Sequence, residues 1–364
     1  GLPLALELAG AFLRHRSIGW GQYRDLLNQN LKAALPARFL ASSFTQHESD
    51  LYSTLKVDEQ ILSEEPILRE VLDVLTWSGP GPMGKSLLEA VLGPRALAGL
   101  EAALALGVEL RLLQKTPGAD NYALHRLVRE VRREDEPLTA RPDWAAGIAD
   151  NLGLWFRKLK RDFADLPRFE AEIDHLRVWQ EHIQSIRPAT GTLLVWLQAY
   201  PPFHRGRYMD ARALLEQARL SLEQSRDPDL ILQADVLSDL CTIHTTLGFG
   251  AEARQCGEAA LEIRLKLFGE HHSETAMTCH NLAGALTATA TRSDPSAPPR
   301  EVTERALALE QKALGIWLET SGEDHIDTAL ALDAISQDYV YLAKYEDALA
   351  YAERGLAVRE RVLG

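Results

Sequence analysis

The sequence predicts an all-α fold with a small β wing, in which a winged-helix domain is followed by an α-solenoid of stacked helix pairs. Two observations lead to this prediction. Four alanines recur at spacings of 42, 53 and 42 residues, namely Ala211, Ala253, Ala306 and Ala348. A fixed period of this size indicates stacked units, which usually recognise another macromolecule rather than perform chemistry. Upstream, glycine and proline breaks divide residues 66–134 into short helical stretches that end in an alternating, strand-like stretch.

The first half of the chain is divided by helical spacing and its interruptions. Residues 1–62 begin with a helix at 3–16, because Pro3 suits a first helical turn and Leu4, Leu8 and Phe12 share one face. Residues 63–136 have the order of a winged helix, with Gly107 expected to end its third helix. The expected elements are helices at 66–77, 86–92 and 96–106, strands at 109–113 and 122–124, and a closing helix at 125–134.

The second half is predicted to be helical throughout. Residues 137–188 form a helical linker, and residues 189–364 form four helix pairs. The pairs are 190–203 with 207–225, 229–247 with 250–268, 273–290 with 301–321, and 326–342 with 345–363. The 11 extra residues of the middle spacing belong to an insertion at about 291–301. It falls between the two helices of one pair, so we expect the stacking to be kept.

Composition excludes several classes of function. A net charge of −13 disfavours nucleic acid and anionic membranes as partners. No apolar run is long enough to cross a membrane, no signal peptide is present, and the three cysteines form no CxxC pair, so a cytoplasmic protein is expected. His271, His272 and His325 recur with the repeat, which indicates a role in a turn rather than a metal site.

One segment matches a phosphate-binding motif. Gly79 to Ser86 reads Gly-Pro-Gly-Pro-Met-Gly-Lys-Ser, which satisfies G-x-x-x-x-G-K-[ST]. A true loop of this kind follows a buried strand, whereas residues 66–77 have helical spacing. Its two prolines also lack the N–H groups that would hold a phosphate. The match is therefore interpreted as a coincidence, with nucleotide binding through Lys85 and Ser86 as the alternative.

The winged-helix order also raises the question of DNA binding. The helix that would enter the groove, at 94–107, carries Arg95 against Glu101, and its face is alanine and leucine. Such a helix is expected to pack against its neighbours rather than read bases.

The repeats suggest which residues contact a partner. In stacked pairs the first helix of each pair lines the inner face, and Cys241, Ala283 and Ser336 are taken as equivalent packing positions. Counting from them, the predicted contact residues are Asp235, Ser238, Thr242, Met277, His280, Asn281, Asp333 and Gln337, with Gly284 and Leu330 at equivalent places. Short polar side chains can hydrogen-bond a peptide backbone. A solvated groove used for intramolecular docking is the alternative.

The repeats resemble tetratricopeptide repeats of the kinesin-light-chain type. Residues 258–271 read Glu-Ala-Ala-Leu-Glu-Ile-Arg-Leu-Lys-Leu-Phe-Gly-Glu-His, similar to that family's second helix and turn. Residues 322–329 repeat the turn, and Asn281-Leu282-Ala283 is similar to the core of the first helix. The family usually has proline after the histidine, where this chain has His272 and Ile326. The resemblance covers residues 189–364 and implies a protein or peptide ligand.

The first part of the chain resembles the end of a STAND-type signalling NTPase of the NB-ARC group. Gly1 to Ala5 reads as its Gly-Leu-Pro-Leu-Ala motif, and residues 124–128 stand where the family has Met-His-Asp. The resemblance implies that Pro3 and His125 contact ATP or ADP only in an intact parent, whose nucleotide-binding core precedes Gly1. Arg126 replaces the family's Asp, which weakens the expected hold on ADP.

Together these features predict a non-catalytic chain with no catalytic residues, no metal and no cofactor of its own. The predicted function is that of the sensor arm of a STAND-type ATPase. In that function the array binds a protein or peptide, and the arm controls activation or oligomerisation of the NTPase domain, its intramolecular partner. Two alternatives stay open, a free-standing scaffold or adaptor and a nucleotide-binding fragment.

Overall fold

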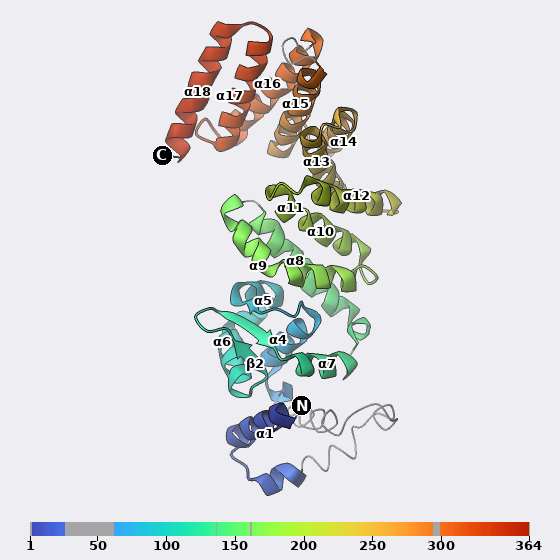
Figure 1. Cartoon of the computed structure of the whole chain (residues 1–364), viewed down its shortest axis with the longest axis vertical. Helices are drawn as coiled ribbons and strands as arrows, with labels where there is room; N and C mark the ends of the chain where they lie inside the picture. The colour runs from blue at the N-terminus through green and yellow to red at the C-terminus, as the bar shows by residue number, and fades with distance from the viewer. Residues whose placement is uncertain (1, 26–61, 136, 161, 294–298, 364) are drawn as a thin grey trace. The chain divides into compact units, whose positions relative to one another are not determined.

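The computed structural model describes residues 2–25, 62–135, 137–160, 162–293 and 299–363 (Figure 1). The protein is mostly helical (81%) with one three-stranded antiparallel sheet. Two compact units, Gly1–Leu197 and Gln198–Gly364, make up the chain and are described separately. Within the described residues, no helix combines the length and apolar character needed to span a membrane.

The first unit contains an N-terminal helix, a mixed helix-and-strand segment and a group of linker helices. The first two parts are α1 (Leu2–Arg16), α4 (Pro66–Trp77), β1 (Met83–Gly84), α5 (Lys85–Leu92), α6 (Pro94–Glu109), β2 (Leu113–Lys115), β3 (Asn121–Leu124) and α7 (Arg126–Asp135). The linker part is η2 (Leu138–Ala140), α8 (Pro142–Leu159), η3 (Phe163–Asp165), α9 (Leu166–Ile183) and α10 (Pro188–Gln198). Most of the segment predicted as 1–62 lies outside the described residues.

The sheet contains one strand more than the sequence predicts. Its order is β1-β3-β2, with Met83 opposite Tyr122 and Leu113 opposite Leu124. β1 is only two residues long, too short to show an alternating pattern, which is why it was not predicted.

The third helix also runs further than expected. α6 continues through Gly107 to Glu109, because this glycine serves close packing and not a helix end. A Cβ at Gly107 would lie 2.6 Å from Leu113 Cδ1 and 2.9 Å from Leu68 Cδ1. The reversal occurs instead at Arg111, whose φ of 62° is left-handed. The first strand of the hairpin is therefore shifted from the predicted 109–113 to Leu113–Lys115.

The linker helices share a core with α4. Trp179 of α9 is fully buried, and its Nε1 donates to Ser78 Oγ at 2.9 Å, directly after α4. Phe156 of α8 and Phe169 of α9 stack edge to face with ring centres 4.6 Å apart. Burial of large aromatic side chains is the main source of stability in such a core.

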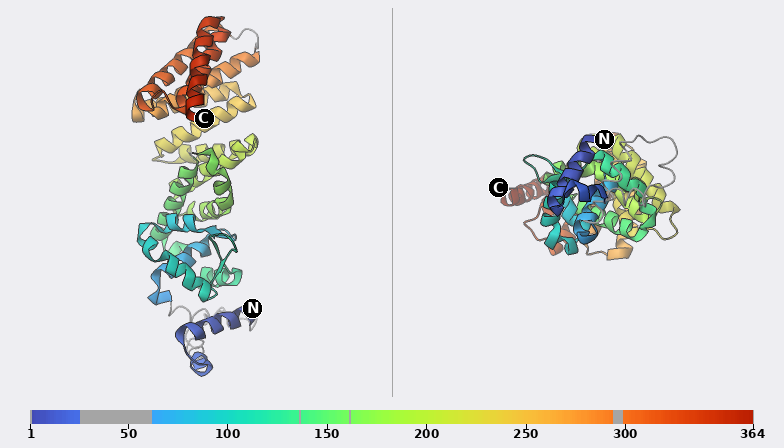
Figure 2. Two further views of the ribbon diagram at one scale, coloured as in Figure 1. Left: turned by 90° about the vertical axis from the view of Figure 1, so that its left-hand side faces the viewer. Right: turned by 90° about the horizontal axis from the view of Figure 1, so that it is seen from below.

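The second unit consists of helices that pair in sequence order. They are α11 (Tyr200–His204), α12 (Tyr208–Gln224), α13 (Leu230–Leu247), α14 (Gly250–Phe268), α15 (Ser273–Ser293), α16 (Arg300–Thr320), α17 (Ile326–Tyr341) and α18 (Tyr345–Leu363). From α12 onward they confirm the predicted pairs, and Figure 2 shows α15 to α18 side by side from another direction. The four repeat alanines are at most 4% exposed, so small side chains stand where helices meet.

Two details of the predicted helix pairs differ from the structure. The helix predicted at 190–203 is split into α10 and α11, because Pro201 and Pro202 lack the N–H groups that would continue it. The insertion predicted at 291–301 is partly helical, since α15 runs to Ser293 and α16 begins at Arg300. The intervening residues 294–298 lie outside the described ranges.

The recurring histidines act in turns, as predicted. His272 Nδ1 accepts from Glu274 N–H at 3.1 Å before α15, and His325 Nδ1 accepts from Asp327 N–H at 3.2 Å before α17. Each turn also holds a glycine at positive φ, Gly269 and Gly322. The imidazole therefore satisfies a free N–H of the first helical turn.

Candidate functional site

The residues predicted to contact a partner lie on the first helices of three successive pairs. We call this set the first-helix face. It comprises Asp235, Ser238 and Thr242 on α13, Met277, His280 and Asn281 on α15, and Asp333 and Gln337 on α17. Most of these side chains are half-buried. Their bonds to neighbouring helices therefore decide which of them stay open to a partner.

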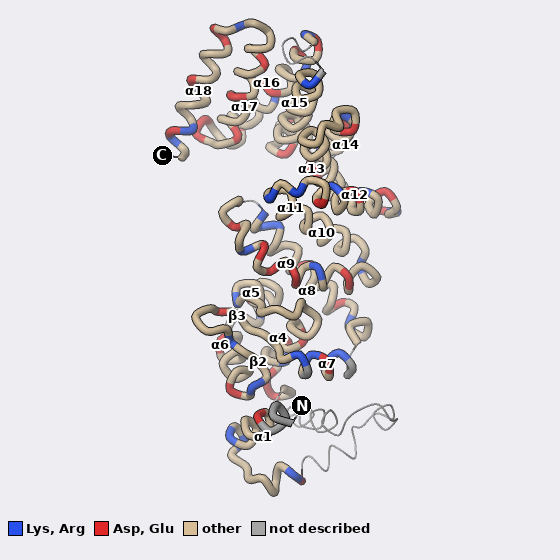
Figure 3. The backbone as a smooth tube through the Cα atoms, viewed as in Figure 1, with Lys and Arg blue, Asp and Glu red and all other residues tan. Residues whose placement is uncertain are grey.

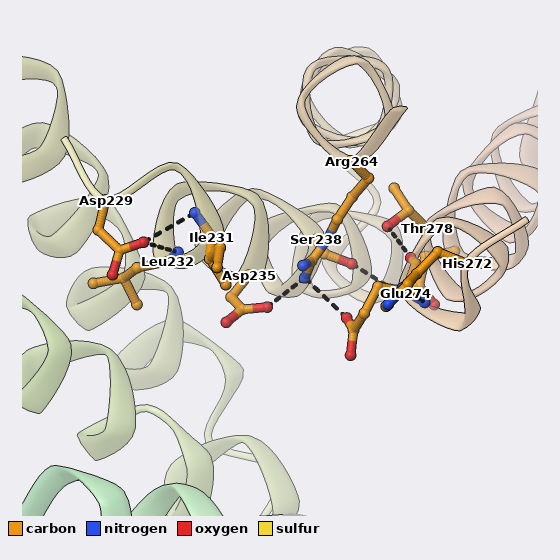
Figure 4. A network of polar contacts seen from close by, with 10 residues as sticks. Asp229, Ile231, Leu232, Asp235, Ser238, Arg264, His272, Glu274 and Thr278 are labelled. Atoms are coloured by element: carbon orange, nitrogen blue, oxygen red, sulfur yellow. Dashed lines mark hydrogen bonds and ion pairs between the residues drawn. The ribbon is translucent and has the colours of Figure 1, made fainter. Parts of the chain in front are cut away.

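Asp235 is engaged by an arginine of the second helix of its own pair. It forms an ion pair with Arg264 of α14, a residue only 3% exposed. The same guanidinium nitrogen, Nη2, lies 3.0 Å from Glu274 Oε2 of α15. Figure 4 shows Arg264 reaching between these two carboxylates. One cation thus joins α13, α14 and α15.

A direct hydrogen bond between Ser238 and Asn281 joins α13 to α15, the first helices of two successive pairs. Asn281 Nδ2 of α15 donates to Ser238 Oγ of α13 at 2.9 Å. Cys241 Sγ of α13 donates to the carbonyl of Asn281 at 3.6 Å. These small polar groups therefore hold two repeats together.

His280 lies against a buried carboxylate. Its Nδ1 is 2.9 Å from Glu310 Oε2 of α16, and Glu310 is 1% exposed. Burial raises the pKa of Glu310, opposed by the bond to His280. Burial alone would lower the pKa of His280, but Glu310 raises it overall. The pair consequently holds a proton more tightly in the folded state than its separate members would.

A second buried carboxylate stands close to this pair. Asp338 of α17 is 3% exposed, and Thr287 Oγ1 of α15 donates to its Oδ1 at 3.2 Å. Burial, with a smaller contribution from the charge of Glu310, raises the pKa of Asp338 to about 7. The hydrogen bond from Thr287 opposes this shift. Three titratable groups from α15, α16 and α17 thus form one buried polar cluster.

Only part of the first-helix face remains open. Asp333 forms an ion pair with Arg359 of α18, and Met277 packs against a core cluster. Gln337 is exposed, as is Gly284, the equivalent residue of α15. Thr242, the equivalent residue of α13, is half-buried, and its Oγ1 donates to the Ser238 carbonyl at 3.2 Å. An added Cβ at Gly284 would meet nothing within 4 Å. Thr242, Gly284 and Gln337 therefore form a stripe of half-buried to exposed positions, one on each of these three first helices.

Sequence reasoning missed Arg264, Glu310 and Asp338. The first two lie on second helices, which were not considered for the face. A signal was nevertheless present in the repeat. Arg264 occupies the position of Trp317, and Glu310 the position of Gly257. A charged residue at a position where the neighbouring repeat has an uncharged one indicates that another side chain of the same protein pairs with it.

The segment that matches a phosphate-binding motif is already occupied by the chain itself. It follows a helix, α4, as predicted. Gly84 N–H donates to Glu172 Oε1 at 2.9 Å, and Lys85 forms an ion pair with Glu101. Glu172 is 8% exposed, and burial raises its pKa to about 7 against this hydrogen bond. A carboxylate of α9 thus stands at the start of α5, where a phosphate would bind.

We therefore expect the chain to bind neither ATP nor ADP with micromolar affinity. The Glu172 side chain already occupies the Gly84 N–H that a phosphate would need, and the adjoining cleft of about 500 Å³ also contains Glu89 and Asp120. Titration calorimetry with MgATP tests this for the wild type and for Lys85→Ala. Micromolar binding that Lys85→Ala abolishes would contradict it.

Pro3 and His125 belong to different parts of the first unit. Pro3 belongs to α1, and His125 lies between β3 and α7, where its carbonyl accepts from Arg129 N–H at 3.0 Å. Their role toward a nucleotide of a larger protein stays a prediction.

The helix pairs and their turns define a repeat protein, and comparison with known families identifies the type of repeat. Models of the tetratricopeptide repeat match residues 234–274 and 301–361. The second unit is thus an array of tetratricopeptide repeats. No curated protein matches the sequence.

Several solved structures are similar to this chain at a distance. BtubC (BKLC) of P. vanneervenii is 22% identical, with a TM-score of 0.42 over 56% of this chain and 74% of its own. A STAND protein with a tetratricopeptide repeat sensor from Pyrococcus horikoshii is 15% identical, with a TM-score of 0.46 over 97% of this chain and 53% of its own. The apo quorum sensor NprR of B. thuringiensis is 13% identical, with a TM-score of 0.38 over 98% and 97%.

Proposed function

We propose that this chain is a non-catalytic recognition arm whose array binds a protein or peptide along the first-helix face. The observation that carries the proposal is the open stripe of Thr242, Gly284 and Gln337. These three equivalent positions leave room for a ligand backbone beside groups that can hydrogen-bond to it. Lys, Arg, Asp and Glu are interspersed along the array (Figure 3), which favours a partner of mixed polarity over a polyanion.

The arm is proposed to serve a STAND-type ATPase. The resemblance of residues 1–5 and 124–128 to motifs of that group supports this finer assignment. In such a protein, partner binding would favour an open arrangement over a closed one and so activate the ATPase core. A partner that binds the array without changing ATP hydrolysis by a protein that carries the core would instead identify an adaptor.

A tryptophan at Gly284 is expected to abolish partner binding and leave the fold intact. Its side chain would project into the open stripe, and no atom near Gly284 has to move for its Cβ. Ligands are first selected with the purified chain from a randomised peptide library. Their affinity for the wild type and for Gly284→Trp is then compared, and we expect a loss of at least about 100-fold, which equals about 2.7 kcal/mol.

Gly315→Trp is the matched control. Gly315 is also an exposed glycine inside a helix, α16, and its Cβ would likewise meet nothing within 4 Å. Both substitutions change helix propensity by the same amount. Selected peptides that bind Gly284→Trp as well as they bind the wild type would show that recognition does not use this face.

A further inference from the structure

A second cleft lies in the array, away from the first-helix face. It has a volume of about 490 Å³ and runs between α12 and α14, with α13 as its floor. On α13 its lining residues are Gln233, Leu237 and His244. An α-helix turns about 100° per residue, so these three lie within about 40° of one another and about 150° from Asp235, Ser238 and Thr242. The cleft therefore opens on the opposite side of α13.

The cleft exists because three positions depart from the repeat. They are Arg219 on α12, His244 on α13 and Cys256 on α14. One repeat later, the equivalent residues are Leu261, Leu286 and Leu309, which pack together in a hydrophobic cluster. In the last repeat they are Leu314, Tyr339 and Tyr351, which belong to another core cluster, with the two tyrosine rings 5.4 Å apart. In the two later repeats these positions are therefore filled by apolar contacts, whereas between α12 and α14 they are occupied by Arg219, His244 and Cys256.

The floor of the cleft contains a buried imidazole, that of His244, with one ring nitrogen that makes no hydrogen bond within the described residues. His244 is 2% exposed, and among the described residues its Nδ1 has no hydrogen-bond partner. Its Nε2 faces Glu216 Oε1 at 3.5 Å. Burial, reinforced by the charge of Arg212, lowers the pKa of His244, so the imidazole is neutral. With its proton on Nε2 toward Glu216, Nδ1 is an acceptor for an N–H group.

Two charged groups beside His244, Glu252 and Arg212, have bonding capacity left for a ligand, although the Arg212 guanidinium also lies over the Phe249 ring, 4.7 Å from its centre. Arg219 binds Glu216 at 2.7 Å and also Glu223, and Lys266 binds Glu262 at 2.6 Å. Within the described part of the array, Glu252 has no ion pair, and Arg212 Nε has no hydrogen-bond partner. Four carboxylates and three cations line the cleft, so its net charge is negative when His244 is neutral. An incoming cation would pair with Glu252, and a carbonyl could accept from Arg212.

The length of the cleft indicates a peptide. Its lining extends over about 16 Å of α12 and about 21 Å of α14 at 1.5 Å per residue. An extended segment of about five or six residues has the same length. A single amino acid would occupy only one end.

We propose that this cleft between α12 and α14 is a binding site for an extended peptide segment that carries an arginine or lysine side chain. The basic group lies between His244 Nδ1 and Glu252, and a main-chain carbonyl accepts from Arg212. The site is separate from the first-helix face and does not depend on the function proposed for that face.

The probes are acetylated and amidated pentapeptides with arginine, lysine or citrulline at the central position and varied neighbours. Calorimetry is expected to give saturable one-to-one binding for basic members, at least about tenfold tighter than for their citrulline counterparts. Arg219→Leu/His244→Leu/Cys256→Leu installs the leucines of the next repeat and should abolish binding. Glu252→Gln, an exposed change that spares the core, should lower the affinity for arginine peptides about tenfold.

Gly284→Trp is the control, because it blocks the first-helix face and should leave these peptides bound. If the triple variant fails to fold, the Glu252→Gln result decides. Absence of saturable binding by every basic peptide, equal affinity for citrulline peptides, or loss of binding in Gly284→Trp would each overturn the proposal.

Discussion

Replacing Arg264 by leucine is expected to destabilise the array by about 3 kcal/mol, the lower end of what breaking a buried ion pair costs. Arg264 is 3% exposed and is the shared cation of Asp235 and Glu274, so its loss leaves two carboxylates facing each other without it. For a unit of this size the midpoint of thermal unfolding should fall by roughly 10 °C. Circular dichroism melts of the wild type and the variant measure the shift.

The next repeat provides the matched control for this prediction. The positions of Asp235 and Arg264 are occupied there by Met277 and Trp317, of which Trp317 belongs to an apolar core cluster and Met277 packs against the same cluster. Replacing both members of a buried pair by apolar residues is often neutral. Asp235→Met combined with Arg264→Leu should therefore recover most of the lost stability. A double variant as unstable as the sum of its single variants would show that Arg264 stabilises by packing alone.

From α12 onward the sequence was sufficient to place the helices of the array. Their bounds follow from apolar spacing and from turns such as Gly269 and Gly322, because local patterns repeat there without interruption. It was insufficient where a residue serves a distant contact. Gly107 looked like a helix end, yet its missing side chain admits Leu113 and Leu68. Such a role depends on tertiary packing, which no local pattern records.

The same reasoning explains the partial success at the candidate site. Period counting placed the eight predicted residues on three first helices, which is what a repeat can reveal. It could not reveal that Asp235, His280 and Asp333 are engaged by residues of second helices. A period describes what repeats have in common, and these bonds arise where they differ. The cleft at His244 is likewise a departure from the repeat.

Asp338→Asn is expected to have little effect below about pH 4 and to stabilise the array increasingly as the pH rises from 5 to 8. The pKa of Asp338 is raised from 3.8 to about 7 in the folded state, so the folded protein binds this proton more tightly than the unfolded chain does. Stability from this group is therefore present at low pH and is lost as the pH rises from about 4 through about 7. Asparagine resembles the protonated acid, and its Oδ1 can still accept from Thr287.

The measurement is the difference in melting temperature between the variant and the wild type at pH 5, 6, 7 and 8. This difference isolates Asp338 from Glu310 and His280, whose raised pKa values also make folding less favourable as the pH rises. Asp324→Asn is the control, because that exposed carboxylate lies on the surface beside Arg361 and such pairs contribute little. A stabilisation by Asp338→Asn that is the same at every pH would show that this carboxyl does not gain a proton on folding. Stabilisation that grows with pH would show that ionisation of Asp338 opposes folding under neutral conditions.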